Sequence, residues 1–178
     1  MEKKKKKGNI GYCIALVLAL LFTIGAATFR FTFSKKEIVG TSMEPTLKEG
    51  QIGYVNHSSW AKSHVKRLDI VVLEVEEDYE IIKRVIALPG ETIQIASNGD
   101  ITITNEEGSF VLDQSFLQEN QKSYTCSNKG YAPHACGKPY QIPEDSYFVL
   151  GDHRSVSLDS ESKYGAIEKS KLVGVWAF

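Results

Sequence analysis

Two segments of this chain contain the residue types that could activate a serine for covalent catalysis. Ser42 opens the run SMEPTL, and Lys83 follows two isoleucines and lies in a largely apolar stretch. A serine hydroxyl is a poor nucleophile until a base removes its proton, and the available bases are histidine, a carboxylate or a neutral lysine. Lys83 is the best-placed base, so the sequence predicts a serine nucleophile paired with a lysine.

The neighbours of Lys83 favour its neutral form. In an extended strand, Ile81, Lys83 and Val85 share one face, and that face is apolar. Burial can lower a lysine pKa by up to about 3 to 5 units from its reference value of about 10.4. We therefore expect Lys83 to be buried and uncharged when active. For a lone lysine, the competing interpretation is a surface position at the edge of a strand.

A membrane-spanning segment precedes both residues. Gly8 to Phe29 contains no charged side chain, and its 22 residues would form a helix long enough to cross a hydrocarbon core of about 30 Å. Five lysines precede this segment, whereas Arg30, Lys35 and Lys36 follow it. The larger basic cluster predicts a cytoplasmic amino terminus and an extracellular remainder.

The alternative for this segment is a cleaved secretory signal, which also begins with basic and then apolar residues. The apolar region is longer than the roughly 7 to 15 residues of a signal core, and the segment from Ala26 to Thr28 is a poor cleavage site. Tyr12 at one end and Phe29 at the other fit the boundary between lipid and water. A retained anchor is therefore favoured.

Charge divides the molecule. Residues 37–178 form a segment of 142 residues, which is enough for one domain with a substantial core. They carry 13 basic and 21 acidic residues, a net charge of −8, whereas residues 1–36 carry a net charge of +7. An acidic domain without a basic stripe argues against nucleic acid as a partner. The expected partner at the amino end is the lipid bilayer.

The hydrophobic pattern beyond the anchor predicts an all-β domain of short strands rich in Ile, Val and Tyr. The Asn-Gly pair at Asn98 predicts a hairpin turn. The stretch after it is more polar and is predicted to be an inserted cap. The expected strands are 51–56, 69–75, 79–87, 91–96, 101–105, 146–150 and 172–178. The expected units are a cytoplasmic basic tail at 1–9, a transmembrane helix at 10–29, a catalytic β domain at 37–98 and 140–178, and the cap at 99–139.

Two cysteines of the predicted cap, Cys126 and Cys136, would lie on the oxidising side of the membrane, where a disulfide is the favoured state. With His134 they could instead supply three metal ligands, but a structural zinc site needs a fourth, and none is evident. Unpaired thiols are the third option. Cys13 lies in the apolar segment and is assigned no chemistry.

Four segments occur in an order that resembles the conserved boxes of type I signal peptidases of the Gram-positive type. That family comprises Ser/Lys proteases that release exported proteins from their signal peptides. The segments begin at Ser42, Arg67, Lys83 and Gly151 and read SMEPTL, RLDIVV, KRVIALPGE and GDHRSVSLDS. The resemblance implies a signal-peptidase-like antiparallel β fold with a small inserted cap and one N-terminal transmembrane helix.

The same resemblance implies a role for several residues. Ser42 would be the nucleophile, its backbone amide would contribute to an oxyanion hole, and Lys83 would be the general base. Ser157 corresponds to the serine that hydrogen-bonds and orients the lysine. Ile38, Met43 and Ile82 correspond to residues that line shallow pockets for small side chains before the cut.

Two acids of the last box, Asp152 and Asp159, correspond to structural residues of the family, and Arg84 would pair with Asp152. The arginine that usually pairs with the second acid is replaced here by Glu161, in a loop one residue longer than usual. Lys163 is the candidate replacement, although lysine lacks the fixed fork of arginine.

A Ser-His-Asp triad is an alternative, because His57, His64, His134 and His153 all lie beyond the anchor. None of them lies in a recognised triad motif, and His153 occupies a position that is usually asparagine in the resembled family. The lysine base is therefore favoured.

Together with the predicted anchor, the resemblance implies a membrane-anchored endopeptidase that removes N-terminal signal peptides from preproteins through an acyl-enzyme. Neither a metal nor an organic cofactor is implied. The substrates could be the general secretome or a restricted set such as pilins. One alternative is a peptidase-like assembly factor or chaperone for surface proteins, but such proteins have lost the dyad that this chain keeps. A repressor-type self-cleaving protease is disfavoured by the anchor and by the lack of a DNA-binding segment.

Overall fold

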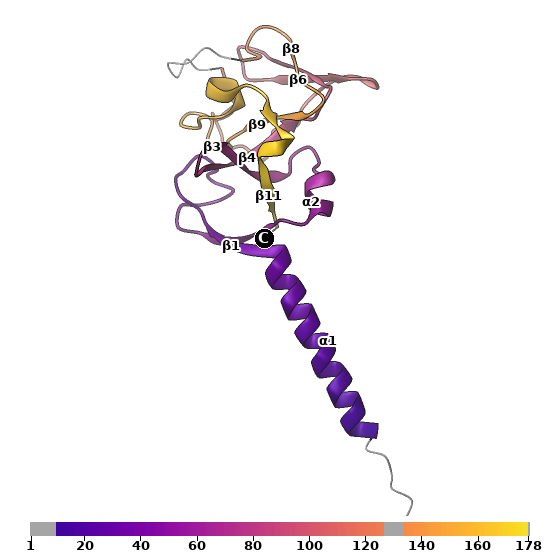
Figure 1. Cartoon of the computed structure of the whole chain (residues 1–178). Helices are drawn as coiled ribbons and strands as arrows, with labels where there is room; N and C mark the ends of the chain where they lie inside the picture. The colour runs from indigo at the N-terminus through magenta and orange to yellow at the C-terminus, as the bar shows by residue number, and fades with distance from the viewer. Residues whose placement is uncertain (1–9, 127–133, 178) are drawn as a thin grey trace, which may run out of the picture.

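The structure is a computed structural model that describes residues 10–126 and 134–177. A long helix leads into a domain built from two antiparallel sheets (Figure 1). The expected basic tail at 1–9 lies outside the described residues. An all-β domain behind one apolar helix is what the sequence predicts, and the fold confirms it.

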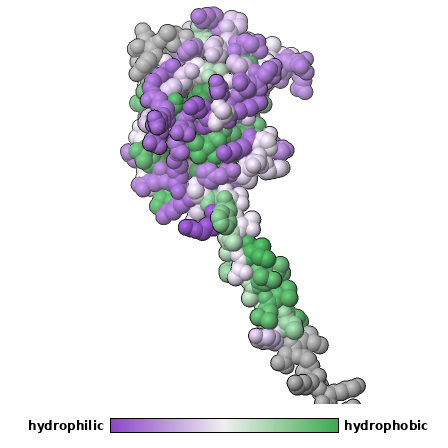
Figure 2. Space-filling view, in the orientation of Figure 1, coloured by the Kyte–Doolittle hydropathy of each residue, from purple (hydrophilic) through white to green (hydrophobic). Residues whose placement is uncertain are grey.

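Helix α1, Ile10–Thr32, is apolar on every side and projects from the domain. Its spanning segment, Gly11–Thr32, has a mean hydropathy of 2.3 and none of it is buried against the rest of the protein. Figure 2 shows this stretch as an apolar rod below a largely polar head. The helix ends three residues after the expected 29, because no helix breaker precedes Phe33.

The larger sheet positions both predicted catalytic residues: Lys83 lies in one of its strands, and Ser42 lies in a loop that follows another. Among the described residues its strand order is β1-β2-β11-β3-β4-β9-β10, with antiparallel pairing throughout. Its strands are β1 Phe33–Glu37, β2 Ile52–Asn56, β3 Ile70–Glu76, β4 Tyr79–Ala87, β9 Ser146–Leu150, β10 Ile167–Glu168 and β11 Leu172–Trp176. A short helix, α2 Ser59–Ser63, follows β2 and packs on β11.

The smaller sheet has the order β7-β6-β5-β8 within the described residues. Its strands are β5 Thr92–Ile95, β6 Ile101–Asn105, β7 Gly108–Val111 and β8 Tyr140–Gln141. Strands β5 and β6 form the expected hairpin, and Gly99 provides the positive φ of +82° in its turn. Strands β5 and β8 lie outside 99–139, so the smaller sheet combines strands of the predicted cap with strands on either side of it.

The two sheets share one hydrophobic core, which explains why the cap is not a separate domain. Ile86 of β4 and Phe148 of β9 pack in the same cluster as Ile93 and Ile103 of the smaller sheet. A second cluster, with Val71, Val85 and Val149, lies in the larger sheet. Strand β4 contributes to both clusters, so its second half is buried on both faces. That burial surrounds the position of Lys83.

Candidate active site

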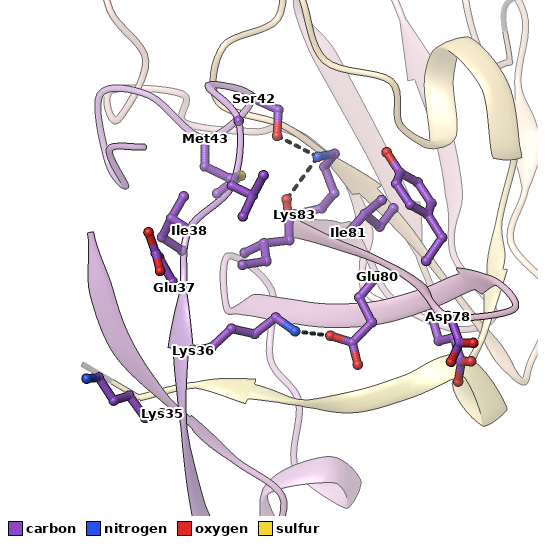
Figure 3. A pocket seen from close by; sticks show the side chains of 15 residues that line it. Lys35, Lys36, Glu37, Ile38, Ser42, Met43, Asp78, Glu80, Ile81 and Lys83 are labelled. Atoms are coloured by element: carbon purple, nitrogen blue, oxygen red, sulfur yellow. Dashed lines mark hydrogen bonds and ion pairs between the residues drawn. The ribbon is translucent and has the colours of Figure 1, made fainter. Parts of the chain in front are cut away.

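Ser42 and Lys83 lie together although 41 residues separate them in the chain. Ser42 lies in the loop that follows β1, and Lys83 lies in the middle of β4. The Nζ atom of Lys83 is 2.7 Å from Oγ of Ser42 and 2.9 Å from the carbonyl oxygen of Ile82 (Figure 3). This is hydrogen-bond distance, so Nζ can exchange a proton with Oγ directly.

Lys83 is only 3% exposed. In the ladder it lies opposite Val71, and Ile81 and Val85 on either side of it belong to the buried core. Taking an ammonium out of water disfavours its charged form. A buried lysine amine at hydrogen-bond distance from a serine hydroxyl is the arrangement that a lysine base requires.

The histidines do not provide a competing base in the described structure. The backbone N–H of His153 donates to the carbonyl of Ser42 at 3.0 Å, and its Nδ1 lies 3.2 Å from the carbonyl oxygen of Thr41. His57 contacts Ser34, His64 contacts Ser63, and the ring of His134 lies edge-on against Tyr140. His153 thus holds the backbone of the serine loop instead of contacting the serine hydroxyl.

Gly151 lies in a space that admits no side chain. A Cβ placed on it would lie 2.2 Å from Oγ of Ser157 and 2.5 Å from the carbonyl oxygen of Ser42. Ser157 is fully buried, and its backbone N–H donates to the carbonyl of His153. The last box is therefore folded closely against the loop of Ser42, with the Ser157 hydroxyl and the Ser42 carbonyl oxygen both near the place that a side chain on Gly151 would occupy.

Asp152 forms a buried ion pair with Arg84. Nε of Arg84 is 2.9 Å from one carboxylate oxygen, and Nη2 is 2.5 Å from the other. The Thr46 hydroxyl donates to the same carboxylate at 2.5 Å. Thr46 lies in the SMEPTL run, so this network ties the serine loop to β4 and to the last box. The sequence assigned no role to Thr46, although its place in the motif was a usable signal.

Asp159 is held by backbone and hydroxyl donors. Its carboxylate accepts from the N–H of Gly151 at 3.0 Å and from the N–H of Glu161 at 3.2 Å, and it caps the turn at 160–164. The expected replacement partner, Lys163, does not fill the place of the missing arginine. Its Nζ is 3.1 Å from Glu76 instead, and this hydrogen bond raises the pKa of Lys163. The turn directs Lys163 outward, which corrects that expectation.

The cation near Asp159 is Arg154, which the sequence left without a role. Arg154 is 1% exposed, its Nε donates to the carbonyl of Gly151 at 2.9 Å, and its Nη1 donates to Gln114 and Thr125 at 3.0 and 2.7 Å. Burial lowers the pKa of Arg154 to about 10, while Asp159 and Asp152 oppose this shift. Arg154 remains charged at neutral pH, and it joins the last box, at Gly151, to the inserted segment, at Gln114 and Thr125.

Cys126 and Cys136 form a disulfide in the structure. Sulfurs bonded to each other are not thiolates, so this state does not provide the ligand set of the alternative zinc site. The bridge anchors backbone beside the turn that holds Asp159, because the N–H of His134 donates to the carbonyl of Glu161 at 2.7 Å. A carboxylate oxygen of Glu161 also lies 3.3 Å from the sulfur of Cys136.

A groove runs past the dyad. It has a volume of about 630 Å³ and is lined by β1 and the loop after it on one side and by 78–83 on the other. Ile38 and Met43 are almost fully buried and pack with the partly buried Ile82 beside this groove (Figure 3). The three residues expected to line substrate pockets thus form one apolar patch next to Ser42.

Comparison with known proteins gives a consistent result. A sequence model of the family described as "Signal peptidase, peptidase S26" matches residues 10–178. The chain is 34% identical to Signal peptidase I P of Bacillus subtilis subsp. natto, over 98% of this chain and 90% of that protein. It is 30% identical to Signal peptidase IB of Staphylococcus aureus strain Mu50, over 93% of this chain and 84% of that protein. A crystal structure of a signal peptidase I from Enterococcus faecalis V583 aligns with a TM-score of 0.46 and 26% identity, covering 64% of this chain and 97% of that one.

Proposed function

Since this chain belongs to the signal peptidase family, peptidase S26, we propose that Ser42 is its nucleophile and Lys83 its general base. The chain is a membrane-bound type I signal peptidase, a serine endopeptidase that cleaves signal peptides from preproteins. The observation that supports the assignment of the dyad is the 2.7 Å contact between Nζ of a buried lysine and Oγ of the serine.

The proposed reaction has two steps. Nζ of Lys83 takes the proton of Ser42, and Oγ attacks the scissile carbonyl to form a tetrahedral intermediate. The backbone N–H of Ser42 stabilises the oxyanion. Lys83 then gives its proton to the leaving amine, and an acyl-enzyme remains. Water, deprotonated by the same lysine, hydrolyses the ester and restores the hydroxyl of Ser42.

Several supporting roles follow from the contacts. Asp152, Arg84 and Thr46 hold the serine loop against β4, and Asp159 fixes the backbone of Gly151. Ser157 packs behind Ser42 and would orient the lysine. None of these groups needs to carry the transferred proton. Their proposed function is to keep the distance between Nζ and Oγ short.

The substrate would lie extended in the groove beside the sheet, with its scissile carbonyl over Ser42. Strand addition at an open sheet edge supplies backbone hydrogen bonds, and side-chain pockets supply specificity. The patch of Ile38, Met43 and Ile82 is apolar and lies beside Ser42, so we propose that it receives the small apolar side chains before the cut. Pilin precursors are one restricted class that the same groove could accept, and they belong among the substrates tested.

The anchor complements this chemistry. It confines the enzyme to the membrane in which its substrates are also held, and this raises their effective concentration near the serine. The five lysines before the spanning segment, against three basic residues directly after it, support a cytoplasmic amino terminus with the catalytic domain outside the cell. A non-cutting assembly factor would have no use for the Ser42 and Lys83 contact, so the enzyme is favoured over that alternative.

The test compares the detergent-solubilised parent with Ser42→Ala, Lys83→Met and His153→Asn variants on a preprotein substrate. Loss of either member of a dyad lowers kcat by roughly a thousandfold or more, because the nucleophile or its base is gone. The histidine variant should retain cleavage. Unchanged thermal unfolding would show that the two inactive variants are folded. Cleavage by Lys83→Met at the rate of the parent would contradict the assignment of the base.

A further inference from the structure

An ion pair crosses the groove a short distance from the dyad. Lys36 extends from β1 and Glu80 extends from β4, and their charged groups meet between the two strands (Figure 3). Both side chains line the groove, and they are 32% and 30% exposed. We propose that this pair, named here the clasp, closes the groove in the free enzyme and must open when the precursor binds. The proposal rests on the function proposed for Ser42 and the groove.

The clasp joins two strand edges that have no other partner there among the described residues. Strand β1 is the outer strand of the sheet and pairs only with β2. Strand β4 pairs with β3 along its length, but its pairing with β9 begins only at Arg84. The first half of β4 therefore presents an open edge to the groove. An extended precursor segment that pairs with either edge must occupy the space that Lys36 and Glu80 now cross.

The position of the clasp defines which part of the precursor meets it. Glu80 precedes Lys83 by three residues on β4, which corresponds to about 10 Å along a strand. Strand β1 begins directly after the anchor helix, so the clasp lies on the membrane side of Ser42 along the chain. The precursor is held in the bilayer by the segment upstream of its cut. The residues about three to four positions upstream would therefore pass the clasp.

Opening the clasp has an electrostatic cost. Glu80 lies directly opposite Glu74 in the β3–β4 ladder, and like charges at such positions repel. Lys36 offsets this repulsion while the clasp is closed. Removing the ion pair should therefore make substrate binding tighter. It should leave the chemical step unchanged, because no hydrogen bond joins Lys36 or Glu80 to Ser42 or Lys83 among the described contacts. A purely structural pair would show the opposite, a weaker or less active enzyme when broken.

The experiment measures kcat and KM with a peptide that has no charged side chain in the five residues before the cut. Lys36→Met and Glu80→Gln should each lower KM about two- to fivefold, the range for an exposed ion pair, with kcat unchanged. The double variant Lys36→Glu with Glu80→Lys restores an ion pair across the groove and should raise KM back toward the parental value, although not fully, because a lysine at position 80 also faces Glu74. Lys122→Met is the control, because it removes the ion pair between Lys122 and Asp100, which lies at the turn of the β5–β6 hairpin and does not line the groove, and it should leave KM unchanged.

Salt provides a second measurement. Raising the ionic strength screens an exposed pair, so KM of the parent and of the charge-swapped variant should fall with salt, whereas KM of the two neutral variants should not. The uncleaved peptide, titrated into each variant on a Ser42→Ala background, should show the same pattern in Kd. This binding measurement tests the clasp even if the parent does not cleave the peptide. Failure to cleave would count against the proposed function and not against the clasp. An unchanged or raised KM and Kd in the neutral variants would overturn the clasp.

Discussion

The position of Ser42 beside Lys83 depends on the small size of Gly151 and on hydrogen-bond donors that lie behind the serine loop. Gly151 leaves room for Ser157 and for the carbonyl of Ser42 where any Cβ would collide. The residue types and apolar neighbours made Ser42 and Lys83 candidates for a dyad, and the resemblance of the four motifs to a known family decided in their favour. The role of Arg154 could not be predicted, because its acceptors come from segments distant in sequence and only the folded chain brings them together.

The buried contacts of Arg154 lead to a prediction about the stability of the protein. Arg154→Met leaves the buried acceptors of Gly151 and Thr125 without their donor and removes the positive charge near Asp159. We expect a loss of about 3 to 5 kcal/mol in the free energy of unfolding. Urea unfolding in detergent measures it. Arg154→Lys keeps the charge but not the fork, and it should lose less. A loss below about 1 kcal/mol in the Met variant would show that the arginine is not structural.

Among the secondary-structure elements, the strands rich in hydrophobic residues are the ones whose bounds the sequence predicts. The bounds of β4, β6 and β9 coincide with those expected, and β2, β3, β5 and β11 differ by one or two residues. Strand β1 reads FSKKE and β7 reads GSFV, and their exposed, polar character gives no strand signal. The pairs of residues that form β8 and β10 are strands only because a neighbour pairs with them. The membership of these strands in a sheet is decided by pairing between residues that are distant in the sequence, which a local pattern does not show.

The disulfide gives the prediction for the inserted segment. Replacing Cys126 and Cys136 together by serine removes a cross-link with a sequence separation of 10, and loops of this length contribute about 2 to 3 kcal/mol. We expect Tm to fall by roughly 5 to 10 °C. Differential scanning calorimetry of the detergent-solubilised chain, with and without reductant, checks it. Reductant should lower Tm of the parent by the same amount and leave that of the double variant unchanged. Equal Tm values in all four samples would refute the prediction.

The whole molecule combines a polar, acidic head with an apolar anchor that makes few contacts with it. Phe29 of α1 stacks on Phe33 and lies beside Tyr54, and the rest of the spanning helix is exposed. The sequence predicted this division from charge and hydropathy alone. What it could not predict is the direct passage from α1 into β1, because nothing in the sequence FRFTFSKKE marks where the helix stops and the strand begins.

Removal of residues 1–32 tests the contribution of the anchor. The truncated chain keeps β1 and the complete described domain, so it should cleave a short soluble peptide with kcat/KM within about twofold of the parent. With a precursor embedded in vesicles it should be at least about a hundredfold slower, because the shared membrane no longer concentrates enzyme and substrate. Parallel assays with both substrates measure the difference. Equal loss on both would mean that α1 is needed for folding of the domain.

The direct junction between α1 and β1 also has a geometric consequence. Thr32 is the last helical residue and Phe33 the first of the strand, with no flexible joint between them. The serine loop follows a few residues later on the same continuous backbone. We therefore expect Ser42 to lie at a nearly fixed height above the lipid surface. A precursor would then be selected by the distance of its scissile bond from the bilayer as well as by the side chains around it.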